Sequence, residues 1–507
     1  MKLLFVSCIS VCVELDNNEA YFAPDIYDVY LNHKMLLKGV KTNVFSIYDL
    51  KPDTNYEIEV NDSLLKFKTK NVSEILLIDN IDKTGKNDVT SVIQKTIDEA
   101  KNDALIILEK GTYLFSSIMM KSNLTFYIKK GVCMNATTDE TAYKEIDGEE
   151  KDGNKLIERG TWEGSPSRMK LSMFNFIDVE NCNLIGEGMI DGNAQKSTWW
   201  IDFRKKSYAR PHIVFMNHSR NISVQGINFY NSPQWTIHPY FCCNLNFLDF
   251  SITNPKISPN TDGINPQCSN EVNIIGVHFS VGDDCVAIKS GKMYIGETFK
   301  TPSEYIVIRD CLMENGHGAV VLGSEMSGGI KNLDVEKCIF SHTDRGLRIK
   351  TRRGRGKTAI IDGVVFKNII MDNVLTPLVI NMFYFCDPDG KTEYVYSKEK
   401  LPVDNRTPFL GKFVFDNIKA INCEYSAGYF YGLPEQSIGE IEILNSSFSF
   451  KDDAGKGTPA MMSFAEECSK KGFIFYNVNK VLLKNIKMFG QEGEIYELNN
   501  VKDIDYE

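Results

Sequence analysis

The sequence has little histidine, no Cys-x-x-C motif and no long apolar run. It contains 7 histidines and 13 cysteines, and the cysteines are scattered from Cys8 to Cys468. Cys242 and Cys243 are adjacent and therefore poorly placed to bridge each other. Because neither a disulfide framework nor zinc-ligand spacing is visible, we expect reduced, mostly buried thiols. No apolar stretch is long enough to cross a bilayer, so no membrane partner is predicted.

Excess positive charge is also missing. The chain of 507 residues carries a formal charge of −10, so it is not built as a whole to coat a polyanion, and no nucleic-acid module is visible. Hydrophobic residues make up 43% and charged residues 24%, as in an ordinary globular protein. The length allows two or more domains, or one long repeat domain.

The N-terminus lacks the cleavage site of a signal peptide. Lys2 and the apolar run Leu3–Val13 resemble a short signal peptide, but Glu14-Leu15-Asp16 follows in place of a small-x-small motif. The run also alternates and is rich in β-branched residues, as a first strand would be. We therefore predict a strand and a cytoplasmic protein, with secretion as the alternative.

Residues 1–75 are predicted to form a small β-sandwich. Gly, Pro, Asn and Asp punctuate its short expected strands, which are Leu3–Leu15, Tyr27–Leu31, Val44–Tyr48, Tyr56–Val60 and Leu65–Thr69. The segment Leu50–Tyr56 resembles the Leu-x-Pro-x-Thr-x-Tyr signature of fibronectin type III modules, in which the tyrosine packs over the preceding turn. We expect a spacer or packing module.

Residues 76–507 repeat short strands without intervening helices. One amphipathic helix, Thr90–Ala100, comes first, with Thr90 or Asp88 as its N-cap. The first strands of five successive units then start 23 to 33 residues apart, and these starts are Ile222, Leu245, Val272, Tyr305 and Leu333. A sandwich would show shorter spacing, and a doubly wound fold would need helices. The pattern predicts an all-β, right-handed parallel β-helix whose open end is capped by the helix.

Polar residues recur just before or on the second strand of successive units. Equivalent positions stack at roughly 4.8 Å per rung, so these side chains should line one groove. They are Asp262, Asp283, Asp284, His317, Arg348, Lys350 and Tyr384. Each alone has a plainer explanation, such as a solvated turn, a structural histidine or a core tyrosine, but together they favour a site. Seven basic residues and no acidic one between Arg345 and Lys357 indicate an anionic ligand.

Four motifs carry a resemblance to a known family. Asn260-Thr261-Asp262, Gly282-Asp283-Asp284, Gly316-His317-Gly318 and Arg348-Ile349-Lys350 together resemble the polygalacturonases, glycoside hydrolase family 28. The resemblance covers roughly residues 76–450, with the motifs in the family's order. It implies a right-handed β-helix that hydrolyses α-1,4 bonds between galacturonic acid units, with inversion and without a metal or cofactor.

The same resemblance implies a role for each residue. Asp283 would be the general acid, and Asp262 and Asp284 would hold and deprotonate the water. His317 would support the acid. The implied substrate-binding residues are Arg348, Lys350, Tyr384 and Lys289, the first two gripping the carboxylate beside the scissile bond. An inverting hydrolase needs one protonated and one ionised carboxyl with room for water between them, and clustering raises the pKa of one.

Cleavage from a chain end is expected from three further segments. Gly323–Gly329, Thr351–Gly356 and the insert around Trp162–Pro166 look like the bacterial exo-polygalacturonase branch. Related members cut rhamnogalacturonan or xylogalacturonan, and calcium-dependent pectate lyases also use β-helices, so these activities remain alternatives. An inactive uronate-binding solenoid is disfavoured because all three aspartates are present. The oligomeric state is left open.

Overall fold

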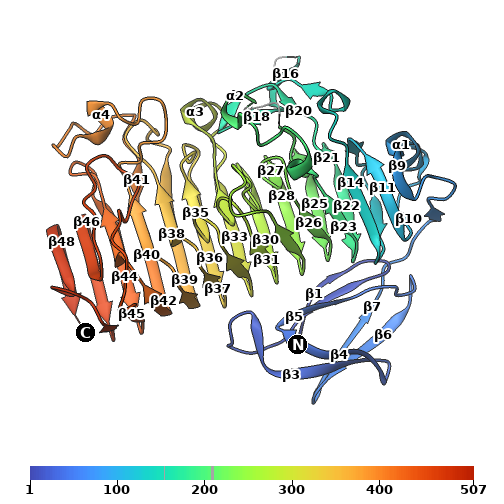
Figure 1. The fold of residues 1–507 in the computed structure, drawn as a ribbon, viewed down its shortest axis with the longest axis horizontal. Helices are drawn as coiled ribbons and strands as arrows, with labels where there is room; N and C mark the ends of the chain where they lie inside the picture. The colour runs from blue at the N-terminus through green and yellow to red at the C-terminus, as the bar shows by residue number, and fades with distance from the viewer. Residues whose placement is uncertain (154, 207–209, 507) are drawn as a thin grey trace.

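A computed structural model describes residues 1–153, 155–206 and 210–506, which form a long stack of coils with a small β unit beside its N-terminal half (Figure 1). The small unit has a three-stranded antiparallel sheet of β1 (Lys2–Val6), β2 (Val11–Glu14) and β5 (Val44–Ile47). Its second sheet has the order β4 (Lys34–Thr42), β3 (Phe22–Leu31), β6 (Asn55–Val60) and β7 (Ser63–Lys68). Apolar residues of both sheets share one core, as in a β-sandwich.

The prediction of one strand over Leu3–Leu15 is wrong. A tight turn from Ser7 to Ser10 divides this stretch into the hairpin β1–β2, with Ser7 N donating to Ser10 O at 2.9 Å. The apolar residues Cys8 and Ile9 continue the alternation through the turn, which hides it in the sequence.

The predicted tyrosine does close over its turn. The Tyr56 hydroxyl accepts a hydrogen bond from Lys51 N at 2.8 Å, and its ring stacks on Phe67 with centroids 5.6 Å apart. The relation to fibronectin type III modules stays a prediction.

The coils are built from three stacks of parallel strands. The first stack contains β8 (Ile75–Leu77), β10 (Ala104–Leu108), β13 (Leu124–Ile128), β22 (Glu180–Gly186), β25 (Arg220–Gln225), β28 (Cys243–Leu248), β30 (Asn270–Ile275), β33 (Ser303–Arg309), β36 (Ile330–Glu336), β39 (Ile360–Asp372), β42 (Lys412–Cys423), β44 (Ile438–Leu444), β46 (Lys471–Lys484) and β48 (Tyr496–Tyr506). The second contains β9 (Thr84–Asp88), β11 (Gly111–Phe115), β14 (Val132–Ala136), β23 (Met189–Asp191), β26 (Asn228–Tyr230), β29 (Ser251–Thr253), β31 (His278–Ser280), β34 (Leu312–Glu314), β37 (Ile339–Ser341), β45 (Ser447–Phe450) and β47 (Lys487–Phe489), with the later parts of β39 and β42.

The third stack carries the groove predicted from the sequence. It contains β12 (Ile118–Met119), β21 (Phe174–Ile177), β24 (Val214–Asn217), β27 (Ile237–Tyr240), β32 (Val286–Ile288), β35 (Val320–Gly323), β38 (Arg345–Lys350), β40 (Thr376–Asn381) and β43 (Ser426–Tyr431). Isolated bridges at Ile264 join β27 to β32. The short strand β41 (Phe409–Leu410) pairs with β39. The predicted all-β, right-handed parallel β-helix is confirmed.

Like residues stack on like inside the coils. Ile306 and Ile308 of β33 lie in register with Leu333 and Val335 of β36, and all four are buried. Because side chains alternate along a strand, every second residue points inward and continues the same core. Burying one such side chain contributes about 1.5–3 kcal/mol, so the repeat of apolar positions is what holds successive coils together.

Asparagine occupies the same bend position in four successive coils. Asn123, Asn181, Asn221 and Asn244 have φ of 56°, 54°, 55° and 52°, a left-handed conformation that asparagine tolerates better than most residues. The side-chain amides of Asn181, Asn221 and Asn244 each donate to the preceding asparagine in the stack, at distances of 2.7–2.9 Å. We call these four residues the amide ladder.

Helices are few and short. They are α1 (Thr90–Glu99), α2 (Phe203–Lys206), α3 (Met293–Phe299) and α4 (Glu393–Tyr396), with 3-10 turns at Glu140–Ala142 and Ala194–Lys196. Helix α1 lies at the N-terminal end of the stack and buries Ile93 and Ile97 in the coil core, as expected of a cap (Figure 1). Its N-cap position is Val89, not the predicted Thr90 or Asp88. Asp88 Oδ1 nevertheless accepts from the first helical amide, Thr90 N, at 2.7 Å. No helix within the described ranges has the length and apolar character of a membrane span.

The N-terminal sandwich is tied to coils far apart in the sequence. Glu14 pairs with Arg309 at 2.7 Å and with Lys337 at 3.1 Å. Ser10 donates to Gln225 at 2.8 Å. Tyr48 stacks on Tyr127 with ring centroids 6.4 Å apart. A domain boundary after residue 75 stays a prediction.

Candidate active site

A cavity of about 430 Å³ opens on the third stack of strands. All eight residues predicted from the sequence line it, namely Asp262, Asp283, Asp284, Lys289, His317, Arg348, Lys350 and Tyr384. The structure therefore brings the whole predicted set into one pocket. The catalytic or binding role of each stays a prediction.

The register of the coils places the aspartates. Ile264 pairs with Val286, which pairs with Val320, so Asp262 stacks directly on Asp284 one coil further along. The next residue in that column is Gly318, where a Cβ would lie 3.2 Å from Asp284 Oδ1. Glycine in the Gly-His-Gly motif thus leaves the Asp284 carboxylate open to the pocket.

Two cations hold Asp284 in its ionised form. Lys350 Nζ lies 2.8 Å from Asp284 Oδ2, and an Arg348 nitrogen lies 3.5 Å from Oδ1. Although burial acts to raise it, Lys350 and Arg348 together lower the pKa of Asp284 to about 2. Ile349 between them is fully buried in the core, so the alternation of β38 directs both cations to the pocket.

The other two aspartates have the opposite tendency. Burial raises the pKa of Asp262 well above its usual range, and the charges of Asp283 and Asp284 add to this. Burial and the Asp284 charge likewise raise the pKa of Asp283. Asn265 donates to Asp262 Oδ2 at 2.8 Å, but Asp262 Oδ1 is buried without a hydrogen-bond partner among the described residues. An unsatisfied buried acceptor in a pocket is a place for a water or a substrate hydroxyl.

Asp344 is a site residue that the sequence reasoning missed. His317 Nδ1 lies 2.7 Å from Asp344 Oδ2, and this hydrogen bond raises the pKa of His317. The signal was present in the repeat, because Asp344 follows Asp283 and His317 in the same column. His317 N donates to Asp283 O, and Asp344 N donates to Gly316 O, each at 3.0 Å.

Lys289 lies toward the other end of the pocket. Its ammonium is 3.0 Å from Glu325 and 4.7 Å from the ring centroid of Trp235. Although burial acts to raise it, the charges of Lys289 and of the cations Lys292, Arg355 and Lys350 lower the pKa of Glu325 to about 2. The charge of Lys289 is therefore already shared with a carboxylate of the protein.

An insert reaches across this end. It contains the antiparallel pairs β15 (Glu145–Ile146) with β20 (Met169–Lys170), β16 (Glu149–Asp152) with β17 (Lys155–Glu158), and β18 (Thr161–Trp162) with β19 (Ser165–Pro166). We call residues 161–166 the insert hairpin. Figure 1 shows the insert above the third stack, near α3.

The insert hairpin is docked on the pocket wall. Trp162 lies parallel to Trp235, with ring centroids 6.4 Å apart and an interplanar angle of 8°. Lys292 N donates to Gly164 O at 2.6 Å. A Cβ on Gly164 would lie 2.7 Å from the Glu325 side chain, so only glycine fits this approach.

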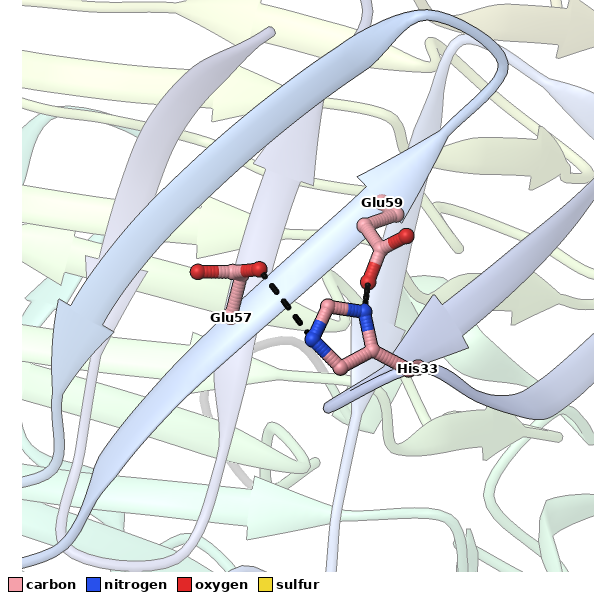
Figure 2. A group of neighbouring side chains, drawn as sticks. All are labelled: His33, Glu57 and Glu59. Atoms are coloured by element: carbon pink, nitrogen blue, oxygen red, sulfur yellow. Dashed lines mark ion pairs between the residues drawn. The ribbon is translucent and has the colours of Figure 1, made fainter.

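Another group of titratable side chains lies on the N-terminal sandwich (Figure 2). His33, Glu57 and Glu59 offer atoms within 4.8 Å of one another. Each ring nitrogen of His33 meets a different carboxylate, with Nδ1 2.5 Å from Glu59 and Nε2 3.7 Å from Glu57. Glu57 also pairs with Lys66 at 2.9 Å. The two ring nitrogens point in different directions, so this is a bridged ion-pair group and not a converging ligand set.

Comparison with known proteins assigns the family. A family model described as glycosyl hydrolases family 28 matches residues 127–399, more than half of the chain. The chain belongs to glycosyl hydrolases family 28. This family match spans all four motifs named from the sequence, including the Asp283 and His317 segments.

Several relatives of this family 28 chain are similar over part of their length. A probable polygalacturonase of Vitis vinifera is 30% identical over 277 residues, which is 53% of this chain and 55% of that protein. An endo-polygalacturonase of Pectobacterium carotovorum is 27% identical over 60% of this chain and 74% of its own. The chain spans about half the length of the first curated relatives it matches.

A solved structure has the same fold. The family 28 exopolygalacturonase of Yersinia enterocolitica superposes with a TM-score of 0.74 at 16% identity, over all of this chain and 98% of that one.

Proposed function

We propose that the protein hydrolyses α-1,4 bonds between galacturonic acid units by an inverting, metal-independent acid–base mechanism. The observation that carries the proposal is a group of three carboxyls with opposite pKa tendencies in one pocket with Lys350: the pKa of Asp284 is lowered, whereas those of Asp283 and Asp262 are raised. Family membership supports the reaction class, and the names of the relatives support the substrate.

Each proposed role follows from its surroundings. Asp283 donates a proton to the glycosidic oxygen as the bond to C1 breaks. Asp284, with Asp262 beside it, orients the attacking water and takes its proton, so the new C1–O bond forms on the opposite face. His317, held by Asp344, places a positive charge near Asp283 and favours loss of its proton.

The cations around Asp284 support both substrate binding and metal independence. Lys350 and Arg348 provide charge-assisted donors for a uronate carboxylate next to the scissile bond. Because they already neutralise Asp284, this carboxylate is a poor ligand for a divalent cation of the kind a pectate lyase requires.

We infer that cleavage starts at a chain end. The support is the insert hairpin, whose Trp162 and Gly164 pack on Trp235 and Glu325 and obstruct one end of the pocket. If the polymer chain cannot extend beyond the insert hairpin, only its terminal sugar can occupy this end of the pocket.

The decisive experiment follows saturated oligogalacturonides by chromatography over time, with proton NMR of the first product. We expect short products from the earliest time point, the inverted anomer, and unchanged activity in chelator. A mixture of intermediate oligomers would mean internal cleavage, and the retained anomer would exclude the mechanism. If only rhamnogalacturonan or xylogalacturonan is hydrolysed, the proposed substrate is wrong but the reaction class stays the same.

A reducing compartment remains our proposal for its location. All 13 cysteines are free, and most are buried. Burial raises the pKa of Cys12 and Cys285 well above the usual range, which keeps these thiols protonated and unreactive. Fractionation of the source cells would test a cytoplasmic against a secreted location.

A further inference from the structure

One carboxylate at the obstructed end of the pocket has no partner. Glu163, at the tip of the insert hairpin, lines the pocket and makes no hydrogen bond or ion pair with another described residue. Neighbouring acids in the same wall are paired, Glu325 with Lys289 at 3.0 Å and Asp387 with Lys292 at 3.2 Å. Glu163 is therefore available to a ligand.

The turn itself does not call for glutamate. Its two central residues, Glu163 and Gly164, have φ of 43° and 75°, the sign pattern of a type I′ turn. Asn-Gly and Asp-Gly are preferred there, because short polar side chains tolerate the left-handed conformation. Glutamate thus weakens the hairpin locally, which indicates that its longer carboxylate serves the pocket.

The proposed acid–base roles determine in which direction the sugar chain lies in the pocket. In an inverting displacement the water lies on the side of C1 opposite the leaving oxygen. By register, Trp235, on which the insert hairpin packs, and Asp262 lie in the coils before Asp283, the proposed acid. His317 and Lys350 lie in the coils after it. The sugar that departs with the glycosidic oxygen therefore lies toward Lys350, and the non-reducing end lies toward the insert hairpin.

The two ends of the pocket have opposite chemistry. The Lys350 end suits the carboxylate of a uronate. A glutamate carboxylate repels another carboxylate but accepts hydrogen bonds from hydroxyl groups. Glu163 is exposed at the tip of the hairpin, within reach of a ligand in the pocket. Partial desolvation and the charge of Glu325 raise its pKa, against the opposing effect of Lys292 and Lys289.

We propose that Glu163 reads the hydroxyl groups of the terminal, non-reducing sugar and so selects chains with an intact saturated end. This rests on the proposed function. Residue 163 is then a specificity-determining residue: it accepts from the terminal ring, and its charge turns away a chain that would continue past it with a further uronate.

Oligogalacturonides with an unsaturated non-reducing end can test this proposal. A β-eliminating lyase expels the glycosidic oxygen from C4 and leaves a double bond between C4 and C5, so the new non-reducing end lacks its 4-hydroxyl. Such a chain cannot make one of the proposed hydrogen bonds. A hydrogen bond to a charged group corresponds to roughly 10- to 100-fold in kcat/KM.

The experiment compares saturated and 4,5-unsaturated trigalacturonate with the full-length protein and three variants. Glu163→Asn keeps a favoured turn residue but shortens the side chain, and Glu163→Gln keeps the length without the charge. Lys151→Ala, on the exposed β16 of the same insert, is the matched control. We expect the native protein and Lys151→Ala to prefer the saturated substrate about 10- to 100-fold. Glu163→Asn should lose most of this preference, and Glu163→Gln part of it.

The proposal is overturned if the native protein cleaves both substrates equally well, or if Glu163→Asn keeps the full preference. Melting temperatures of the variants separate a local effect from unfolding, and Glu163→Gln provides the answer if Glu163→Asn does not fold. Cleavage of neither trigalacturonate by the native protein would instead remove the proposed function itself.

Discussion

The pocket and the amide ladder are two columns made by the same stacking, with opposite consequences. In the amide ladder, Asn181, Asn221 and Asn244 each donate to the asparagine one coil back. In the pocket, Asp262 stacks on Asp284, and neither carboxylate can donate to the other when ionised. An amide both donates and accepts, so repeating it stabilises the coils, whereas repeating a carboxylate is unfavourable.

The difference fits a stabilising role for the amide ladder and the proposed acid–base role for the pocket. Asp284 is tolerated because Lys350 and Arg348 neutralise it, and Asp262 and Asp283 are driven toward the protonated form. Perturbed carboxyls that gather in one cavity are what an acid–base mechanism needs. Five substitutions separate the pocket from the amide ladder.

Asp283→Asn should have the largest effect on the pocket. An amide cannot protonate the leaving oxygen, so we expect kcat to fall by about 10²–10⁴-fold or more while substrate binding survives. Turnover of trigalacturonate and calorimetric binding of the same substrate measure the two quantities. Near-normal kcat would show that Asp283 is not the acid.

Lys350→Ala should come next. Losing a charge-assisted contact to the substrate carboxylate is expected to reduce kcat/KM by on the order of 2–4 kcal/mol, with little change in melting temperature. The variant should also discriminate less between free acid and methyl ester. A sharply lower melting temperature with an intact preference would mean that Lys350 serves only to neutralise Asp284.

Asp344→Asn should change the pH profile. The Asp344 carboxylate accepts a hydrogen bond from His317 Nδ1 and thereby raises the pKa of His317, so His317 stays charged to higher pH in the native protein. Its contribution to stability is present below the unfolded pKa and is lost as pH rises through the folded pKa. We expect the alkaline limb of kcat/KM to move to lower pH, with about a 3- to 10-fold loss on that limb. If the alkaline limb of kcat/KM does not move, the charge of His317 does not influence the rate.

Asp262→Asn and Asn221→Ala should change stability in opposite directions. Asp262→Asn removes a buried carboxyl beside Asp284. We therefore expect the free energy of unfolding to increase by about 0.5–2 kcal/mol and the melting temperature to rise. Because the pKa of Asp262 is raised in the fold, the gain should grow as pH rises from about 4 through that pKa. Asn221→Ala interrupts the amide ladder and should cost about 1 kcal/mol without affecting kcat.

A fall in melting temperature for Asp262→Asn, or a rise for Asn221→Ala, would reverse the contrast between the columns. Thermal unfolding at pH 4 and pH 7 is sufficient to measure both.

Features that repeat could be predicted from the sequence. The spacing of apolar strands gave the β-helix, and the position of Asp262, Asp283 and His317 before successive strands gave one pocket. Asp344 also follows this period, but it has no adjacent glycine to mark it, because Arg345 stands between it and Gly346. Lys289 was placed correctly in the pocket, but its pairing with Glu325 depends on a backbone path that no period encodes.

Features outside the repeat could not be predicted. The contacts of Trp162 and Glu163 depend on how the insert folds back over Trp235, a tertiary choice that local propensity does not contain. The turn inside Leu3–Leu15 was hidden because Cys8 and Ile9 are apolar residues within a turn.

The N-terminal sandwich contacts several coils of the β-helix at once and so links them to one another. In a stack of coils each coil contacts only its neighbours, so opening can begin at one end and spread step by step. Here Tyr127, Gln225, Arg309 and Lys337 all contact the N-terminal sandwich. Arg309 and Lys337 lie in neighbouring coils, and the others lie in coils further back along the stack. Bending or fraying between these coils must break several of these ties together. The coils between Tyr127 and Lys337 include those that carry Asp262 and Asp283, so we expect the coils beneath the pocket to unfold together and not one at a time.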